Sequence, residues 1–374
     1  MSTANLQASS SLPRHHGLDS LRAVAILLVM MYHYMVFVSN QASFGLLSEI
    51  GWMGVDLFFV LSGYLIGDQI FSEMAARGRL RIARFYGRRA LRTLPNYWFV
   101  LAIYFLFPQQ AGGNQVTPLW QFLSFTQNLH LVPGSAFSHA WSLCVEEQFY
   151  FVLPLIAVLC LGFCRSVKAM WWVIGVTMIS CAIARCWMLQ KVGADGGLYR
   201  TYVYYPSWGR MDELMPGVAI ALIKNFHHER WNAFMQKAQT HLIKGGALLV
   251  FSVVLFQEFS YDNEVGFLWF ATTFGYSILS VAFAYLVLSA LSPHSYLSRW
   301  RIPGAETLAL CSYALYLIHK PLMNALVTPL QKWQWEMDQA VVIALMFVAS
   351  GLSAFLMFRY LESPFMRLRS RWFP

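Results

Sequence analysis

Long apolar runs, each close to the length that crosses a membrane, alternate along this chain with short polar segments. A membrane-spanning helix needs about 20 consecutive apolar residues. The runs that approach this length are 21–39, 51–71, 93–108, 141–163, 169–189, 206–223, 245–259, 267–291, 306–327 and 338–360. The pattern predicts an all-α polytopic bundle of about ten transmembrane helices, in one domain over residues 1–374. Residues 1–16 are expected to be a flexible cytoplasmic N-terminus, and 361–374 a short basic cytoplasmic tail.

The composition supports a membrane protein and argues against a nucleic-acid-binding one. Hydrophobic residues make up 57% of the chain, charged residues only 12%, and the mean hydropathy is +0.48. Soluble domains average about 25% charged residues, so this chain could not cover itself with a polar surface. The net charge of +9 would indicate nucleic acid only if the basic residues formed one exposed stripe, whereas they lie in short segments between apolar runs.

The basic residues also predict the orientation, because cytoplasmic loops carry an excess of Lys and Arg. If the N-terminus is cytoplasmic, 20 of the 27 Lys and Arg residues fall on that side. They are Arg14, Arg77, Arg79, Arg81, Arg84, Arg88, Arg89, Arg92, Arg165, Lys168, Lys224, Arg230, Lys237, Lys244, Arg299, Arg301, Arg359, Arg367, Arg369 and Arg371. The outer loops at 109–140 and 260–266 have none. An even number of spans with both termini in the cytoplasm satisfies this bias.

Ionisable residues inside the predicted spans fall at a common depth. They are His33, Asp56, Glu146, Glu147, Arg185, Arg210, Asp212, Glu213, His319 and Lys320. Counted from the span ends, most lie ~5–10 Å below the outer surface. Charged groups are costly in lipid, so they are expected to converge on an interior cavity. Histidine is the usual general base near neutral pH, which favours a catalytic site. The alternative is a set of ion pairs that hold helices together.

The first span carries Arg22 near its cytoplasmic end and His33 deep inside. They are 11 residues apart, which corresponds to about three helical turns, so both share one face, ~16 Å apart. A long substrate with an anionic head and a reactive tail would fit between them. The simpler interpretation of Arg22 is a snorkelling anchor paired with Asp19 at i, i+3.

The loop at 77–95 carries seven arginines and no acidic residue. Arginine forks bind phosphate oxygens in pairs, and Arg89 and Arg92 would face one way on a helix. We therefore expect a phosphate site here. The alternative is a topology signal that also attracts anionic lipid. The cysteines lie in apolar segments without CxxC spacing, so neither a metal site nor a disulfide is expected.

The chain resembles the acyltransferase family 3 of integral-membrane acyltransferases in motifs that follow one another along nearly its whole length. Arg22 and His33 are similar to the family's basic residue, ten intervening residues and histidine, and Arg89 and Arg92 to its Arg-x-x-Arg element. The other similar segments are GWMGVDLFFVLSGYLI (51–66), HAWSLCVEEQFYFVLP (139–154), RMDELMPG (210–217), YALYLIHKP (313–321) and YLESPF (360–365).

The resemblance implies an acyl-CoA donor, often acetyl-CoA, and a hydroxyl acceptor on a cell-surface carbohydrate. It implies a plasma-membrane enzyme whose partners are acyl-CoA, a carbohydrate or lipid-linked glycan and membrane lipids, with no nucleic acid and no tightly bound cofactor. Some members carry a fused extracytoplasmic domain. This chain ends at Pro374, so we expect a stand-alone member.

The resulting hypothesis is transmembrane O-acyl transfer. Arg22, Arg89 and Arg92 would hold the CoA phosphates at the cytoplasmic mouth, and His33 would act as general base. Asp56 or Glu146 would orient the imidazole, as the carboxylate does in a catalytic triad. An acyl-imidazole relay through His33 is a second route.

Three alternatives remain open at this point. The acceptor could be a small molecule such as a macrolide. A proton-coupled transporter also uses intramembrane histidines and carboxylates, but it would favour repeated halves, which the chain lacks. A sensor or scaffold would not need reactive groups from six spans. Release of free CoA separates the enzyme from the other two classes.

Overall fold

The computed structural model describes residues 15–374. Arg14 and most of the predicted flexible N-terminus lie outside the described residues. His15 and His16 were expected in that flexible segment, but His15 is the N-cap of the first helix and His16 begins it.

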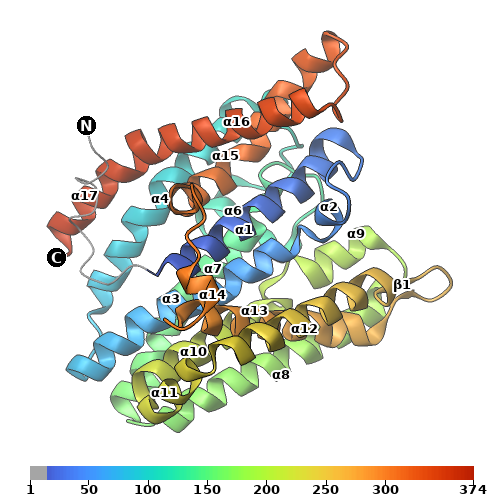
Figure 1. Cartoon of the computed structure of the whole chain (residues 1–374). Coiled ribbons are helices and arrows are strands. Elements are labelled where there is room, and N and C mark those ends of the chain that lie inside the picture. Colours follow the sequence, from blue (N-terminus) through green and yellow to red (C-terminus); the bar gives the residue numbers. More distant parts are fainter. Residues whose placement is uncertain (1–14) are drawn as a thin grey trace.

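The described chain is built from long helices with short connections (Figure 1). The longer helices are α1 (His16–Tyr34), α3 (Met53–Arg77), α4 (Ile82–Leu106), α7 (Trp141–Ala157), α8 (Val167–Val192), α10 (Met215–Phe226), α12 (Ala238–Glu258), α13 (Tyr276–Leu291), α15 (Ala305–Lys332), α16 (Ala340–Met357) and α17 (Ser363–Trp372). The short elements are α2 (Leu46–Ile50), α5 (Pro108–Ala111), α6 (Leu119–Leu123), α9 (Gly196–Tyr199), α11 (His228–Gln236), α14 (Tyr296–Arg299) and the antiparallel pair β1 (Tyr261–Asp262) and β2 (Gly266–Phe267).

Within residues 15–374, seven helical segments are long and apolar enough to cross a membrane by length and composition. They are His16–Ser39, Met53–Arg77, Ser138–Phe163, Val167–Val192, Ala238–Glu258, Ala271–Leu291 and Ala340–Trp372. They correspond to seven of the predicted spans and confirm an all-α multi-pass membrane protein. The other three predicted spans coincide with α4, α10 and α15. A total of ten spans stays a prediction.

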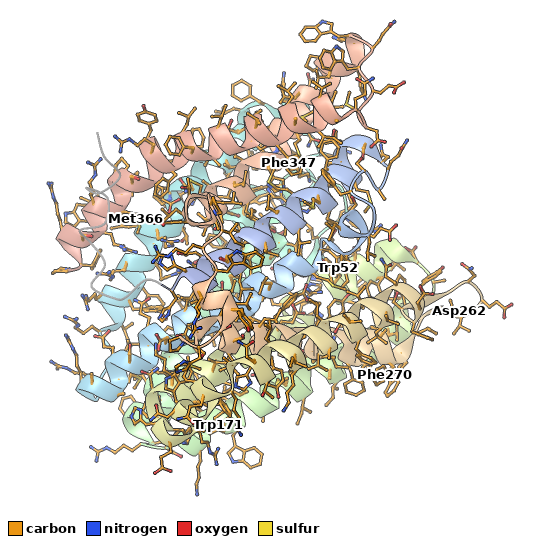
Figure 2. The ribbon with its side chains drawn as sticks, in the orientation of Figure 1. Trp52, Trp171, Asp262, Phe270, Phe347 and Met366 are labelled. Carbon is orange, nitrogen blue, oxygen red and sulfur yellow. The ribbon has the colours of Figure 1, made fainter. Side chains whose placement is uncertain are left out.

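The helices form a central group and an outer group. In α3, 72% of the most apolar window is buried inside the protein, against 17% in α8. Helix α1 packs against α3, α13 and α15, and α3 also packs against α10 and α7. In Figure 2, Trp52 lies between α3 and the α12–α13 pair, where its ring meets those of Phe256 and Tyr276. The apolar outer faces of the peripheral helices suit contact with lipid.

Two predicted boundaries are wrong in ways that matter for the site. The arginine-rich segment at 77–95 was expected to be a loop, but α4 begins at Ile82 and continues through Pro95. Arginine is a good helix former, and Phe85 among the arginines packs into the core, so the segment is helical. The predicted span 206–223 is instead broken: 3-10 turns at Ser207–Gly209 and Met211–Leu214 precede the short α10.

Candidate active site

Three histidines from three separate segments meet in the interior. His33 comes from α1, His319 from α15, and His139 from the 3-10 turn Ser138–Ala140 that leads into α7. All three residues are buried: His33 is 7% exposed, His319 0% and His139 3%. The ring centres of His33 and His319 lie 4.9 Å apart, and that of His139 lies 6.2 Å from His33 and 5.4 Å from His319. We call these residues the histidine cluster.

The hydrogen bonds of His319 determine which nitrogen of His33 can act as a base. Nδ1 of His319 lies 2.9 Å from the carbonyl oxygen of Leu315, which can only accept, so Nδ1 carries the proton. Nε2 of a neutral His319 is then an acceptor, and it lies 2.6 Å from Nδ1 of His33. His33 therefore donates from Nδ1 and has its lone pair on Nε2. A general base needs a neighbouring group that fixes the tautomer of its imidazole, and His319 fixes that of His33.

The position of His139 depends on a proline in α15. Pro321 has no N–H, so the carbonyl of Leu317, four residues earlier, has no helical donor. Nε2 of His139 donates to that carbonyl at 3.2 Å. Nδ1 of His139 therefore carries its lone pair, and it is buried without a partner among the described residues. The cluster thus presents two basic nitrogens, Nε2 of His33 and Nδ1 of His139.

The backbone that presents His139 is strained, and a lysine lies beside it. Phe137 is fully buried and has φ +55°, which is unusual for a bulky residue and is found mainly at functional sites. The Nζ atom of Lys320 donates to the hydroxyl of Ser138 at 2.7 Å and lies 4.4 Å from the ring centre of Phe37. Lys320 is 2% exposed, so its amino group is buried beside the histidine cluster.

Asp56, one of the predicted orienting carboxylates, lies elsewhere. Gly54 of α3 packs on the carbonyl of Ala25, where an added Cβ would meet the oxygen at 2.4 Å. His33 is eight residues beyond Ala25 along α1, or ~12 Å. The contacts of Asp56 are with Arg210, and His33 bonds to His319. In the structure a second histidine occupies the place in which the sequence predicts a carboxylate.

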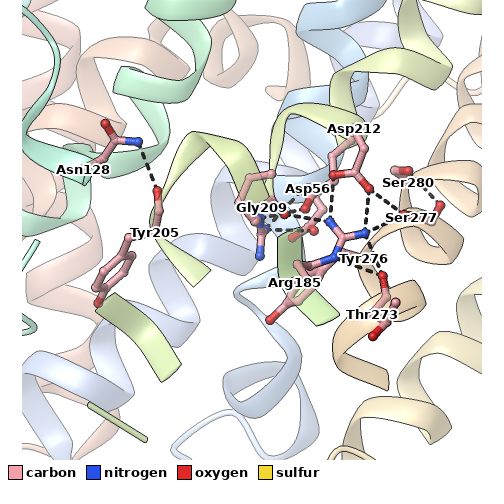
Figure 3. A network of polar contacts seen from close by, with 12 residues as sticks. Asp56, Asn128, Arg185, Tyr205, Gly209, Asp212, Thr273, Tyr276, Ser277 and Ser280 are labelled. Carbon is pink, nitrogen blue, oxygen red and sulfur yellow. Dashed lines mark hydrogen bonds and ion pairs between the residues drawn. The ribbon is translucent and has the colours of Figure 1, made fainter. Parts of the chain in front are cut away.

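Asp56 belongs to a buried ion network (Figure 3). Arg210 pairs with Asp56 at 3.1 Å and with Glu213 at 2.7 Å. Arg185 forms a fork with Asp212, with distances of 2.8 and 2.9 Å. It also donates to the carbonyls of Gly209 and Thr273, whose segments are irregular in backbone. These contacts match the alternative interpretation of the ionisable residues, in which ion pairs hold helices together.

Glu146, the other predicted partner of His33, lies further along α7. It is seven residues beyond His139, which is ~10 Å along a helix. Its carboxylate accepts from Ser62 at 2.8 Å and from Tyr150 at 3.0 Å. Ser142, Glu146 and Tyr150 are spaced four residues apart, so they form a polar stripe on one face of α7. This stripe leads from the histidine cluster toward the arginines.

The predicted donor-binding arginines lie at the far end of the stripe. The Arg89 guanidinium lies 3.9 Å from the ring centre of Tyr150 and 3.7 Å from Glu147. The positive charges of Arg89 and Arg22 both attract the carboxylate of Glu146. Arg22 also pairs with Asp19 at 3.8 Å, as the simpler interpretation predicts. The positive charge of Arg92 on α4 attracts the carboxylate of Glu362, which also accepts a hydrogen bond from the side-chain amide of Asn96.

The single layer of ionisable residues predicted from span ends is therefore divided into three groups. His319 and Lys320 lie with His33, the ion network is separate, and Glu146 and Glu147 lie with Arg89. The depth estimate is wrong for the glutamates because α7 is preceded by a helical turn at the level of His33, so His139 takes the position expected for Glu146. One feature of the sequence points to a partner such as His139. Pro321 leaves the carbonyl of Leu317 without a helical donor, so another group must donate to it.

The fold and the site define a polytopic helical membrane protein with basic nitrogens in its interior and arginines at one end. The chain belongs to the acyltransferase family 3, because the model of this family's acyltransferase domain matches residues 15–359.

Two curated relatives carry functional names. The chain is 28% identical to YrhL of Bacillus subtilis, provisionally named a peptidoglycan O-acetyltransferase, over 94% of this chain and 55% of the relative. It is 26% identical to the peptidoglycan O-acetyltransferase OatA of Listeria monocytogenes, over 93% of this chain and 55% of the relative. The chain spans about half the length of the curated relatives it matches. No solved structure matches it.

Proposed function

We propose that this protein transfers an acetyl group from acetyl-CoA to a hydroxyl of a cell-surface carbohydrate, in the plasma membrane, with both termini in the cytoplasm. Family membership and the names of the relatives support acyl transfer to such an acceptor. The observation that carries the proposal is the hydrogen-bonded pair His33–His319, whose bond to Leu315 leaves a lone pair on Nε2 of His33.

The distances along two helices support a donor that extends from the arginines to the histidines. On α1, Arg22 and His33 are ~16 Å apart, and the same number of residues separates His139, in the turn before α7, from Tyr150 on α7. The histidines meet at one end, and Arg22 and Arg89 both act on Glu146 toward the other. The CoA phosphates would bind the arginines, and the pantetheine arm would follow the stripe on α7.

The chemistry balances within the histidine cluster. Nε2 of His33 takes the proton of the acceptor hydroxyl while its oxygen attacks the thioester carbonyl carbon. The C–S bond then breaks, and the imidazolium returns the proton to the leaving thiolate, which yields an acetyl ester and CoA. In its protonated form, Lys320 stabilises the negative charge that develops on the carbonyl oxygen of the thioester. Transfer through an acyl-imidazole on His33 is the second route, and it would require an acetylated enzyme intermediate.

The direct test is thioester consumption by the purified protein in detergent. We expect free CoA to form from acetyl-CoA only when a carbohydrate acceptor such as a soluble peptidoglycan fragment is present, with one ester formed per CoA. Acceptor-dependent turnover with a macrolide alone would support the small-molecule alternative. If CoA is not released with any acceptor, the acyltransferase proposal is wrong and the transporter becomes the better hypothesis.

The double substitution Arg89→Gln and Arg92→Gln is expected to weaken acetyl-CoA binding. Each arginine contributes a charge-assisted phosphate contact worth ~1.5–3 kcal/mol, so KM for the donor should rise strongly while kcat at saturating donor changes little. Lysine at both positions should restore binding only in part, because lysine lacks the planar fork. Steady-state kinetics with varied donor measures this. An unchanged donor KM would leave these arginines as topology signals.

A further inference from the structure

The last helix, α17, is packed against the arginine-rich part of α4 (Figure 1). The ring of Phe373 lies against Gly87, where an added Cβ would come within 2.2 Å of it. Nη1 of Arg88 donates to the carbonyl of Phe373 at 2.7 Å. The basic C-terminal segment is therefore fixed to α4 by specific contacts.

The packing of α17 adds a fifth arginine to four on α4. Arg84, Arg88 and Arg92 are spaced four residues apart and share one stripe, with Arg89 beside it. The positive charges of Arg92, Arg88 and Arg89 all lie close enough to repel the guanidinium of Arg369 on α17. We call these five residues the arginine cluster.

The arginine cluster has donors without acceptors. The Nε atoms of Arg84, Arg89 and Arg369 are buried and have no hydrogen-bond partner among the described residues. Burying a charged donor without a partner is costly, and so is gathering like charges. The neighbouring acids are Glu73, Glu146, Glu147 and Glu362. Even with all four ionised, five arginines leave an excess of positive charge, which indicates a ligand with anionic groups.

We propose that α17 is part of the donor site, and that Arg369, together with Arg88, binds the 3′-phosphate of CoA. This inference rests on the proposed function, in which Arg89 and Arg92 bind the CoA diphosphate. Arg92 lies one turn before the fully buried Asn96, whereas Arg84 is near the N-terminal end of α4. The pantetheine arm leaves the diphosphate toward the histidine cluster, so the adenosine end must lie on the Arg84 side. Arg88 and Arg92 are ~6 Å apart along the helix, a spacing suited to two phosphates of one nucleotide.

The test compares binding of CoA and 3′-dephospho-CoA to the full-length protein in lipid-free detergent by calorimetry. The two ligands differ only in the 3′-phosphate. We expect the unsubstituted protein to bind CoA about tenfold or more tightly than 3′-dephospho-CoA, as expected for lost charge-assisted contacts. Arg369→Gln should weaken CoA binding by about the same factor and leave 3′-dephospho-CoA binding unchanged. Arg369→Lys should fall between the two.

Arg371→Gln is the matched control, because Arg371 lies on the same helix and is exposed. It should leave both affinities unchanged. Should Arg369→Gln fold poorly, the comparison of the two ligands on the unsubstituted protein still tests the subsite.

The outcomes separate this inference from the proposed function. Equal affinity of the unsubstituted protein for both ligands would overturn the 3′-phosphate subsite and leave the donor proposal standing. An equal loss for both ligands in Arg369→Gln would assign Arg369 to the packing of α17 or to the diphosphate. If added phosphatidylglycerol displaced CoA and bound in an Arg369-dependent manner with no discrimination by the 3′-phosphate, the cluster would be a lipid headgroup site. No binding of CoA at all would refute the donor proposal itself.

Discussion

His33→Ala should abolish acetyl transfer while the protein still inserts, folds and binds acetyl-CoA. Loss of a general base typically lowers the rate by ~10²–10⁴. His33 is ~16 Å along α1 from Arg22, so it should not contribute to holding the phosphates. His33→Gln keeps a hydrogen-bonding group but cannot transfer the proton, and it should be almost as inactive. CoA release and binding of a non-hydrolysable acetyl-CoA analogue, measured in parallel, test both parts.

Substitution of His319 distinguishes orientation from structure. His319→Ala should lower kcat with little change in donor KM, because Nδ1 of His33 would lose its acceptor. His319→Gln should restore part of the rate, since an amide oxygen can accept that hydrogen bond. Arg22→Ala is the matched contrast to His33→Ala on α1, and it should weaken donor binding instead.

Near-normal turnover in His33→Ala would make the imidazole a helix contact. Loss of both turnover and analogue binding would place His33 in the donor site, and the base would then be sought at His319 or His139.

The features that depend on one helix could be predicted from the sequence. The shared face of Arg22 and His33 follows from helical periodicity, and α1 is α-helical across both residues. The similar direction of Arg89 and Arg92 on α4 likewise follows from their spacing of three residues. Whether these residues act in donor binding and catalysis stays a prediction, which the substitutions of His33, Arg22 and Arg89 test.

The features that depend on how helices pack could not be predicted. Helix depth was inferred from hydropathy boundaries, which do not detect the turn before α7 or the register of α3 against α1. His33 therefore meets His319 and His139 instead of Asp56 or Glu146. The carbonyl of Leu317, freed by Pro321, is a local signal, but its acceptance of a hydrogen bond from His139 links residues 178 positions apart.

The ion network shows why a broken helix can be stable at this place. Backbone groups inside a membrane must be satisfied, and irregular backbone is tolerated there only where protein covers it. Arg185 donates to the carbonyl of Gly209 at 2.7 Å and to that of Thr273 at 2.9 Å, in the two irregular segments beside α10 and α13. Its fork to Asp212 compensates its charge, and all these groups are buried. Arg185 is therefore expected to contribute strongly to stability.

Arg185→Leu should destabilise the protein severely. Removing one partner of a buried ion pair typically costs ~3–5 kcal/mol, because Asp212 would remain charged and uncompensated. The carbonyls of Gly209 and Thr273 would also lose their donor, at ~1–3 kcal/mol for each buried group left unsatisfied. Arg185→Lys should recover only part of this loss, since an ammonium group cannot reproduce the fork and both carbonyl contacts. The free energy of unfolding in mixed detergent–SDS micelles is the measurement.

The double variant Arg185→Leu with Asp212→Leu resolves the two contributions. It removes the uncompensated charge but not the loss at the carbonyls, so it should be more stable than Arg185→Leu and less stable than the unsubstituted protein. Lys191→Leu, at an exposed position six residues further along α8, is the control and should change the free energy of unfolding by no more than ~0.5 kcal/mol. Equal stability of Arg185→Leu and Lys191→Leu would contradict the role of Arg185. A double variant as unstable as Arg185→Leu would show that the carbonyl contacts, and not the ion pair with Asp212, account for the stabilisation.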